Sequence, residues 1–499
     1  MPLRVAFLAA ECEPWAKTGG LADVVDALAR ALGRLPEAAS GELATPVDVF
    51  MPRYRRVVVP DGAVVEPPLV IADPLAPDGR TAVSIVDVVA QGYRLRLVDH
   101  PPAFDRDSLY DEPDDAWRFG LFCTAALEAL RRDPDPPDVI HVHDWHTGPA
   151  LLRRALSPTD PFLGSLASLL TLHNLAYHGW TPAAKLPELG ITPSTRRIPV
   201  QPDGIDLLRS AIELTELSNT VSEGFAREAL TPEYGMGLDR DLRRKGDRFF
   251  GILNGLDPDL WNPATDTSLA ARYSRSDVAG KAACRRQLLD TIGFDPGDDG
   301  AVLGMIGRLD PQKGFDLLSA AAPAILAAGG RLVVLGSGHR ELAEPFRALA
   351  TAEPRRVALI EAFDRRLARE IYAGVDMFLM PSRFEPSGQG QMISLRYGTP
   401  PIVRRTGGLA DSVVDVDDEP DRGTGFVFDA ATPRALADAC ARAIRLRAAG
   451  GRPWSDLVDR GMATDFRWET GPAPRYLEAY RRAIAIRRST TGSVADSRA

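Results

Sequence analysis

Two nearly identical loops lie in opposite halves of this 499-residue chain. Residues 17–25 recur at 405–413 as a cation followed by Thr-Gly-Gly-Leu-Ala-Asp, and seven of the nine positions are identical. In each copy, an apolar strand pattern precedes the loop and an apolar-periodic helix pattern follows it. Repeated strand–loop–helix units are typical of parallel sheets covered by helices. The repeat therefore predicts two α/β domains.

Apolar runs elsewhere extend both domains with alternating strands and helices. Strands are predicted at 3–10, 47–51, 139–142 and 169–172 in the first half, and at 301–307, 331–336, 357–362, 377–380 and 401–404 in the second. Residues 59–90 show no clear period and receive no assignment. A polar stretch rich in Gly and Pro between the halves indicates the linker. Small polar residues from Ser489 onward predict a disordered tail.

Charge and hydropathy limit the partners of the chain. A formal net charge of −9 argues against nucleic acid or an anionic membrane, since both favour a broad basic surface. No uncharged run approaches the ~20 residues of a membrane span. The first apolar run is interrupted by Glu11 and Glu13, which favours a buried strand over a signal peptide. The four cysteines are scattered without disulfide or metal spacing, so a reducing cytoplasm is expected.

Each Thr-Gly-Gly loop has the features of an anion site. A glycine pair lets the backbone approach a ligand, and the following helix directs unpaired N–H groups and its positive dipole end toward it. Lys17 and Arg405 add full positive charges. Because open α/β sheets bind ligands beyond the carboxyl ends of their strands, the two loops predict a cleft that closes on one bound anion. The alternative is a tight strand-to-helix turn with a solvated cation.

Two further strand ends in the second half carry charged groups. Arg308 follows one apolar strand, and Lys313 precedes a glycine and a new helix. A guanidinium and an ammonium can thus be aimed at one diphosphate. Glu385 follows the strand at 377–380 and can bind sugar hydroxyls or offset positive charge at an anomeric carbon. Solvated surface cations and a helix-capping carboxylate are the alternatives.

Two strand ends in the first half are rich in histidine. His141, His143 and Asp144 end one apolar run, and His173 ends another. The alternation of His141 and His143 is also compatible with zinc, but the surrounding residues show no motif with defined ligand geometry, so no metal is predicted. Asp144 and His173 are interpreted as hydrogen-bonding groups for a polyol substrate. Polar residues that cap buried strands are the alternative.

At these residues the sequence resembles the bacterial and plant glycogen/starch synthase family. The matching stretches run in the family's order over about residues 3–480, at 17–23, 143–145, 172–177, 219–222, 252–255, 308–314 and 382–408. The resemblance implies an α/β fold of the GT-B class, with two Rossmann-like, doubly wound domains facing across a deep cleft. The implied segments are an N-terminal acceptor-side domain at 1–257, a linker region at 258–299, a C-terminal nucleotide-sugar-binding domain at 300–470, a helix crossing back to the first domain at 471–488, and the tail at 489–499.

The resemblance also implies an enzyme, an ADP-glucose-dependent glucosyltransferase of the cytoplasm. It transfers glucose, with retention of configuration, to the non-reducing end of an α-1,4-glucan and so elongates glycogen. ADP-glucose is then a co-substrate, and no cofactor, essential metal, nucleic acid or membrane is expected. The alternatives are a UDP-glucose-using or disaccharide-forming enzyme of the same architecture, a phosphorolytic glucan enzyme, and an inactive regulator that binds glucan or nucleotide.

The family's functional residues carry over by position. In the catalytic group, Arg308 and Lys313 stabilise the departing diphosphate, Asp144 and His173 bind the glucose and align the acceptor, and Glu385 is the active-site carboxylate. The expected donor-binding residues are Lys17, Gly19, Gly20, Phe363, Ser387, Gly388, Thr406, Gly407 and Gly408, with Phe363 against the base. The family commonly has Cys where Ser387 stands, so a thiol is not expected to be needed. It usually has Leu-Thr or a similar pair where this chain has Gln-Gly, at 389–390.

Overall fold

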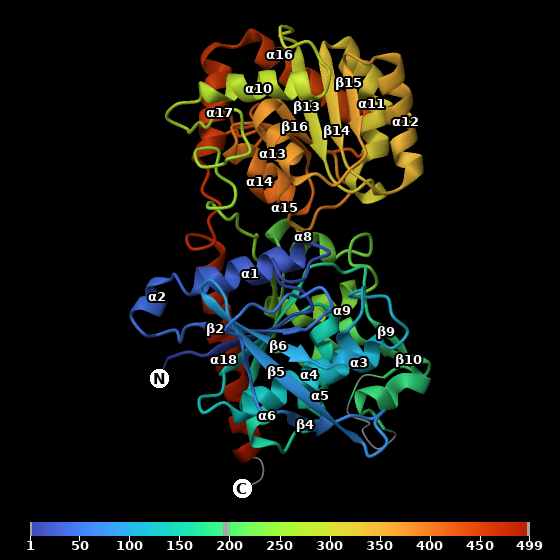
Figure 1. Ribbon diagram of the computed structural model, residues 1–499, viewed down its shortest axis with the longest axis vertical. Helices are drawn as coiled ribbons and strands as arrows, with labels where there is room; N and C mark the ends of the chain where they lie inside the picture. Colours follow the sequence, from blue (N-terminus) through green and yellow to red (C-terminus); the bar gives the residue numbers. More distant parts are fainter. Residues whose placement is uncertain (1, 193–197, 199, 497–499) are drawn as a thin grey trace. The chain divides into compact units, whose positions relative to one another are not determined.

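The computed structural model describes residues 2–192, 198 and 200–496, which divide between two units (Figure 1). The first unit contains the residues through Val221, the segment Ala226–Asn254 and the residues from Trp468 onward. The second contains Ser222–Phe225 and Gly255–Arg467. The region 258–299, predicted as a linker, therefore belongs to the second unit. The first unit is assembled from segments at both ends of the chain.

A mixed sheet forms the centre of the first unit. Its strands follow one another in the order β12 (Phe249–Gly251), β11 (Leu217–Thr220), β8 (Ala167–Leu172), β7 (Val139–His143), β1 (Val5–Leu8), β2 (Val47–Pro52), β6 (Tyr93–Asp99), β5 (Arg80–Val89) and β3 (Val64–Val65), with β4 (Leu69–Ala72) paired to β5. The strands from β12 to β6 are parallel. Strand order reverses at β1, because the chain builds outward to β2 on one side and later returns to β7 on the other. Loops diverge at such a switch point and leave room for a ligand.

The predicted strands of the first half correspond to β1, β2, β7 and β8, and the unassigned residues 59–90 form β3, β4 and β5. These three strands are antiparallel to their neighbours. In β5, Ile85 and Val86 are both buried, whereas Val89 is 95% exposed. Two buried residues in a row break the alternation by which a half-exposed strand is recognised. This break explains why residues 59–90 show no clear alternation of apolar and polar residues.

Helices cover this sheet. In α1 (Gly20–Leu32), Leu21, Val24, Val25 and Leu28 form one buried stripe at helical spacing. The other helices and 3₁₀ turns of the unit, with one short strand pair, are α2 (Pro36–Ala39), α3 (Pro101–Phe104), α4 (Asp115–Arg132), η1 (Trp145–Thr147), α5 (Gly148–Leu156), α6 (Pro161–Ser165), β9 (Trp180–Pro182), η2 (Ala183–Leu189), β10 (Gly204–Asp206), α7 (Leu207–Leu214), α9 (Asp239–Lys245) and η3 (Gly246–Arg248). Helix α8 (Glu223–Ala229) begins in the second unit and ends in the first.

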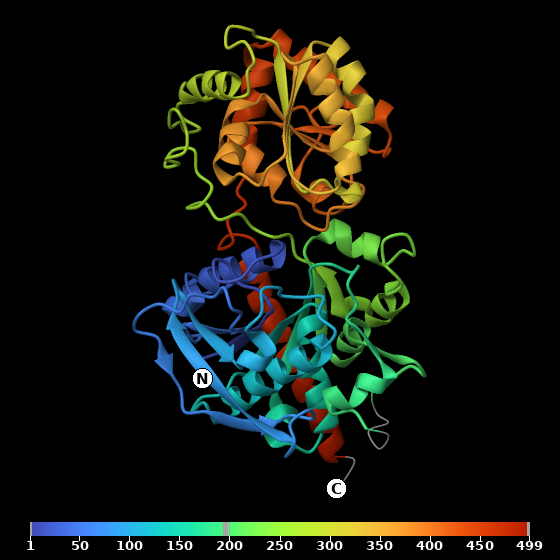
Figure 2. The same ribbon diagram turned by 45° about the vertical axis from the view of Figure 1, so that its right-hand side comes forward.

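The last helix, α18 (Pro472–Asp496), packs against β7, β8 and α1 (red in Figures 1 and 2). It extends beyond the predicted crossing helix at 471–488 into the segment predicted as a disordered tail, of which 497–499 lie outside the described residues. The hydroxyls of Ser489 and Thr490 donate to the carbonyl of Ile486 at 2.7 and 3.0 Å. These bonds give the polar side chains partners within the helix.

The second unit has a sheet whose strands are all parallel. Their order is β15 (Val357–Ile360), β14 (Gly330–Leu335), β13 (Ala301–Ile306), β16 (Met377–Met380), β17 (Pro401–Arg404) and β18 (Phe426–Phe428). Numbered from β13 as the first strand, this is the 3-2-1-4-5-6 order of a Rossmann sheet. The five strands predicted for this half correspond to β13 through β17. Strand order reverses between β13 and β16.

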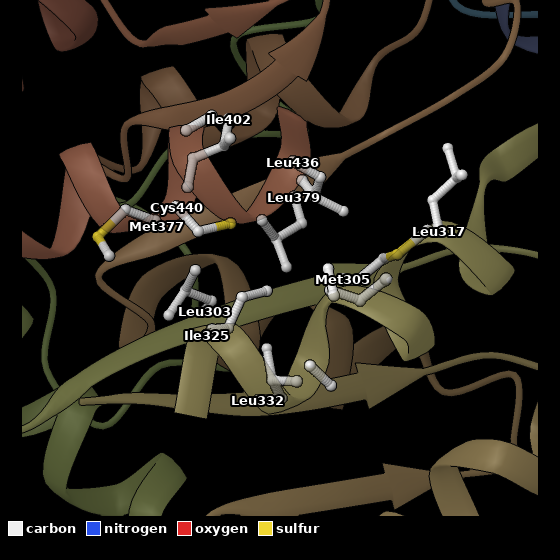
Figure 3. Packing of buried hydrophobic residues seen from close by; sticks show 14 of the residues in the cluster. Leu303, Met305, Leu317, Ile325, Leu332, Met377, Leu379, Ile402, Leu436 and Cys440 are labelled. Atoms are coloured by element: carbon white, nitrogen blue, oxygen red, sulfur yellow. The ribbon is translucent and has the colours of Figure 1, made fainter. Parts of the chain in front are cut away.

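Alternate side chains of these strands face two helical layers. Leu303 and Met305 pack with residues of α11 (Phe315–Ala327) and α16 (Pro433–Ala449), as Figure 3 shows. Val302 points the other way and packs with α10 (Gly280–Thr291) and α13 (Arg365–Gly374). Helices therefore lie on both sides of the sheet (Figure 2). The remaining helices are η4 (Pro311–Lys313), α12 (Arg340–Ala352), α14 (Gly390–Arg396), α15 (Gly407–Ser412) and α17 (Gly451–Ala463).

Helix α10 explains why the region between the domains is not a free linker. Its Leu288 and Leu289 are fully buried, and they share a core cluster with Val302, Val333 and Ile371. Burial of two leucines stabilises this packing by about 3–6 kcal/mol before entropy is counted. Because most of residues 258–299 are polar, the single apolar stripe of α10 does not stand out in the sequence. The segment is thus part of the folded second unit.

The four cysteines are free and buried, in four different parts of the chain. Burial raises the pKa of the thiols of Cys12, Cys123 and Cys440. Across 2–192, 198 and 200–496, no helix is both long and apolar enough to cross a membrane. In the same ranges, no three His, Cys, Asp or Glu side chains gather as ligands for a metal ion.

Leu303→Ala is expected to lower the free energy of unfolding of the second unit by about 2–5 kcal/mol, because Leu303 is fully buried and the change leaves a cavity. Leu260→Ala is the matched control, since Leu260 belongs to the same unit and is 49% exposed. It should change the free energy by less than about 1 kcal/mol. Urea unfolding followed by circular dichroism measures both. Equal costs at the two leucines would contradict the packing described.

Candidate functional site

One group of predicted site residues gathers at the carboxyl ends of the central strands of the first unit. Asp144 follows β7 directly, and His173 follows the neighbouring strand β8. Oδ1 of Asp144 accepts a hydrogen bond of 2.7 Å from the backbone N–H of His173. The loop after β1 ends at Gly19, the residue that precedes α1. The switch point between β1 and β7 therefore lies between this loop and Asp144.

Asp144 has an unfavourable backbone conformation and a carboxyl group that is difficult to ionise. Its φ of 54° and ψ of −169° lie in a region that is used almost only by glycine. Such a backbone costs about 1–3 kcal/mol. Burial raises the pKa of its carboxyl to about 7, although backbone N–H donors from His173 and Asn174 act in the opposite direction. A strained backbone and a shifted carboxyl at one strand end are marks of a functional residue.

Glu11 is a member of this group that the sequence reasoning does not identify. Its buried carboxylate accepts from the backbone N–H groups of Thr18 and Gly19, from Thr18 Oγ1 at 2.7 Å, and from the hydroxyl of Tyr110. An anion supplied by the chain itself thus holds the first Thr-Gly-Gly loop. The sequence signal for this role is the charge of Glu11 directly after an apolar strand, which by itself only argues against a signal peptide. Amides from Gly20 onward remain at the start of α1, as at any helix N-terminus.

Lys17 and the glycines of this loop differ from one another in what surrounds them. Lys17 Nζ lies 2.5 Å from Asp23 Oδ1 and 3.5 Å from Glu13 Oε2, so two nearby carboxylates hold the ammonium. A Cβ added at Gly19 or Gly20 would meet no atom of the described part of the chain within 4 Å. Packing of the chain therefore does not require glycine at either position. A side chain would instead fill the open space before α1.

In the second unit, Lys313 and Glu385 meet at the switch point. Lys313 lies in the loop after β13 and Glu385 in the loop after β16, and these strands are neighbours. Lys313 Nζ is 2.6 Å from Glu385 Oε2, which also accepts from Ser382 Oγ at 3.0 Å. The amide of Gln312 donates to the carbonyl of Phe384 at 3.1 Å and joins the two loops. The structure brings together two residues that the sequence separates by 72 positions.

The second Thr-Gly-Gly loop packs against the backbone of the Glu385 loop. The N–H of Gly408 donates to the carbonyl of Glu385 at 3.0 Å. A Cβ at Gly407 would lie 2.1 Å from that carbonyl oxygen, and one at Gly408 would lie 2.1 Å from the carbonyl of Ser387. Gly407 also has a φ of 43°, which disfavours any side chain. Glycine is required here by close packing, unlike at Gly19 and Gly20.

The arginines beside this loop have different environments. Arg405, the expected cation of the loop, pairs with Asp429 at 2.8 Å and with Asp418 at 3.1 Å. Arg404 is instead buried, and its Nε donates to the carbonyl of Ser382 at 2.8 Å. Arg308 is exposed and forms no ion pair with any residue that the structure describes. Of these three, Arg308 has the charge that is available to a ligand.

The remaining predicted residues of the second unit lie on loops of the same sheet. Phe363 follows β15 and is 82% exposed, with the guanidinium of Arg365 5.8 Å from its ring centre. Ser387 and Gly388 continue the loop of Glu385, and Ser387 is buried. Thr406 is also buried, directly before Gly407. An exposed aromatic ring thus follows the edge strand β15, and a set of small residues follows β16 and β17.

Comparison with known proteins assigns the chain to a family. Residues 4–244 match the family model described as the starch synthase catalytic domain, and residues 300–445 match glycosyl transferases group 1. A glycogen synthase from Syntrophotalea carbinolica is 41% identical over 498 residues, which cover 97% of this chain and 99% of the relative. The chain belongs to the glycogen synthase family. A further family member, from Anaeromyxobacter dehalogenans, is 41% identical over 96% of this chain and 99% of its own length.

Solved structures agree with this assignment. The catalytic domain of starch synthase IV from Arabidopsis thaliana, bound to ADP and acarbose, has a TM-score of 0.86 and 33% identity over 97% of this chain and 100% of that one. Sucrose-phosphate synthase from Thermosynechococcus elongatus has a TM-score of 0.60 at 20% identity over 97% of this chain and 99% of its own, a likeness of fold alone. The predicted family and the predicted GT-B class, with two Rossmann-like units, are confirmed.

Asp144→Asn is expected to stabilise the protein near pH 8 by about 4 kcal/mol and to have little effect near pH 4. Burial raises the pKa of this carboxyl from 3.8 to about 7, so between these values the folded state binds more protons than the unfolded state. Stability of the parent protein therefore falls as pH rises, and the loss is complete above the folded pKa. Asparagine cannot ionise, yet it keeps the oxygen that accepts from His173.

Thermal unfolding at the two pH values measures this difference. The control is Asp61→Asn, because Asp61 is an exposed turn residue of the same unit. It should shift the midpoint equally little at both pH values. A stabilisation by Asp144→Asn that does not change with pH would contradict the raised pKa.

Proposed function

We propose that this chain transfers glucose from ADP-glucose to the non-reducing end of an α-1,4-glucan, with retention of configuration, and so elongates glycogen. The observation that carries the proposal is the Lys313–Glu385 pair at the switch point of a Rossmann sheet. Nucleotides bind at this point of such sheets. The glycogen synthases among its relatives, and the ADP in the starch synthase IV structure, support the same donor and reaction.

The second unit binds the nucleotide in this proposal. Arg308 and Lys313 supply positive charge to the diphosphate, and the exposed ring of Phe363 stacks on the base. Ser387, Gly388 and the loop Thr406-Gly407-Gly408 line the same strand ends. The bond from Gly408 N–H to the carbonyl of Glu385 supports a second role for that loop, which is to hold the carboxylate in place. ADP-glucose is consumed as a co-substrate, and no cofactor or metal takes part.

The first unit binds sugar. Asp144 and His173 provide an acceptor and an imidazole for glucose hydroxyls, and their strand ends are joined by the 2.7 Å bond between them. Lys17, Gly19 and Gly20 contact the donor at the start of α1. The open space around Gly19 and Gly20 supports this role, because no residue that the structure describes occupies it. Glu11 keeps the loop in shape from within.

Lys313 acts on the leaving group. Its ammonium pairs with Glu385 and offsets the negative charge that develops on the diphosphate as the glucosyl–oxygen bond breaks. The acceptor hydroxyl attacks from the leaving-group side, and its proton passes to a phosphate oxygen. Two hydrogen bonds to Glu385 Oε2, from Lys313 and Ser382, lower its nucleophilicity and support this route. A covalent glucosyl–Glu385 intermediate is the alternative, and trapping it would overturn the route.

The cytoplasm is the proposed location. Its support is the state of the four cysteines, which are free and buried in the structure. Buried free thiols are ordinary in reducing compartments, where disulfides are rare. The proposed partners are ADP-glucose and a glucan or glycogen acceptor.

The transfer reaction is tested by incubating the chain with glycogen and labelled ADP-glucose or labelled UDP-glucose. Label is expected in the polymer with ADP-glucose. Incorporation from UDP-glucose alone would correct the donor, and a labelled disaccharide would correct the product. Release of glucose-1-phosphate on addition of phosphate would identify a phosphorolytic enzyme. Binding of glycogen without incorporation from either donor would refute the proposal and identify a regulator.

Lys313→Ala is expected to lower kcat by about 100-fold, while KM for glycogen changes by less than about 3-fold. The ammonium acts mainly when charge develops on the leaving group, so its loss raises the barrier more than it weakens glucan binding. Lys313→Arg keeps the charge and should retain a larger share of kcat. Lys185→Ala is the control, because Lys185 bonds a backbone carbonyl of the first unit. Normal turnover of Lys313→Ala with weakened glucan binding would contradict the assignment.

A further inference from the structure

A second imidazole lies directly behind His173. His143, the last residue of β7, is completely buried, and its Nδ1 is 3.0 Å from Nε2 of His173. In the parallel pair of β7 and β8, His143 stands opposite Thr171, so the two rings come from neighbouring strand ends. Nothing in the proposed reaction uses His143. Its contact with His173 therefore needs its own explanation.

Both rings of this pair are neutral. Burial lowers the pKa of His143 well below its usual value and that of His173 to about 3. No carboxylate bonds either ring among the residues that the structure describes. A neutral imidazole carries hydrogen on one nitrogen only. At 3.0 Å one of the two nitrogens donates and the other accepts, so the pair has two possible arrangements.

The other nitrogen of His143 distinguishes the two arrangements. Nε2 of His143 is buried and has no hydrogen-bond partner in the described part of the chain. If Nδ1 of His143 accepted, this Nε2 would carry a buried N–H without an acceptor. If Nδ1 donates, Nε2 keeps only a bare lone pair. Buried N–H groups without acceptors are rare in proteins, so the donating arrangement is favoured.

The neighbouring His141 does not change this result. Asn219 uses its NH₂ group toward the carbonyl of Thr220 and the hydroxyl of Tyr476, so its Oδ1 accepts from Thr171 Oγ1 at 2.7 Å. The hydroxyl of Thr171 must then accept from His141 Nε2 at 2.6 Å. Nδ1 of the neutral His141 is left to accept from Tyr480 at 2.9 Å. Both nitrogens of His141 therefore have hydrogen-bond partners, and neither is hydrogen-bonded to His143.

We propose that His143 is a positioning residue: its Nδ1–H donates to Nε2 of His173 and holds His173 as the Nδ1–H tautomer, which donates to an oxygen of the sugar. His173 is half-buried, and its Nδ1 has no partner among the described residues. A hydroxyl or ring oxygen of the transferred glucose takes that place. This inference rests on the proposed function for the identity of the ligand, but the tautomer itself does not.

The tautomer is tested by nuclear magnetic resonance of the full chain with nitrogen-15 histidine. His173→Asn identifies the signals of His173 by their loss. The expected pattern in the parent protein, without ligand, is hydrogen on Nδ1 of both His143 and His173. Hydrogen on Nε2 of His173 would overturn the proposal, even if the chain transfers glucose. Hydrogen on Nδ1 of both His143 and His173 would support the proposal, even if no glucose is transferred from ADP-glucose.

Two variants separate positioning from mere packing. His143→Asn places an amide N–H near the position of Nδ1, whereas His143→Leu fills similar space without a donor. His143→Leu is expected to move His173 toward the Nε2–H tautomer and to lower kcat/KM for the donor by about 10–100-fold, with little change in KM for glycogen. His143→Asn should keep the Nδ1–H tautomer and stay within about 5-fold of the parent.

His339→Leu is the control, because His339 is exposed in the second unit. It should leave both the tautomer of His173 and the kinetics unchanged. Equal loss of activity in His143→Asn and His143→Leu, with the tautomer of His173 unchanged in both, would overturn the proposal in favour of a structural role. If His143→Leu does not fold, the spectrum of the parent protein still decides the tautomer.

Discussion

The reversal of strand order at the centre of each parallel sheet is the constraint on which both groups of site residues depend. A parallel strand can be followed by its neighbour only through a crossover, so loops at the carboxyl edge separate where the direction of winding changes. In the first unit this happens between β1 and β7, and in the second between β13 and β16. Glu11 and Asp144 lie on loops of the first pair, and Lys313 and Glu385 on loops of the second.

The repeated Thr-Gly-Gly loops show how one sequence can serve two purposes. Both loops connect a strand to a helix, and in both the glycines lie at the helix start. The first is held by a carboxylate from the same loop, Glu11, and faces open space, whereas the second is packed against the carbonyls of Glu385 and Ser387. The structural role of a glycine in this motif therefore depends on its surroundings in the fold rather than on the motif itself.

Much of this fold and site follows from local patterns, and the remainder depends on tertiary contacts. Apolar runs identify β1, β2, β7, β8 and the strands from β13 to β17, because both faces of a parallel sheet are covered. They do not identify the parallel strands β6, β11, β12 and β18. They do not reveal β3, β4 and β5, which are half-exposed, or the single apolar stripe of α10. Resemblance brings Lys313 and Glu385 into one site, but nothing local pairs Arg405 with Asp418 and Asp429. Hydrogen-bond direction at His143 depends on the partners of both rings, and no spacing in the sequence contains that information.

Helix α18 makes the first unit dependent on the last part of the chain. Among the described residues, only the hydroxyl of Tyr480 bonds Nδ1 of His141, and the hydroxyl of Tyr476 accepts from the side-chain amide of Asn219. These buried polar atoms lack those partners until the two tyrosines have been synthesised. Roughly 220 residues lie between Asn254 and Tyr476. A ribosome that adds about 5–20 residues per second needs roughly 10–40 s to cover them. During that time the sheet of the second unit, whose strands all lie between Ala301 and Phe428, can form. Strands β7 and β8 of the nascent first unit still lack the helix that packs against them.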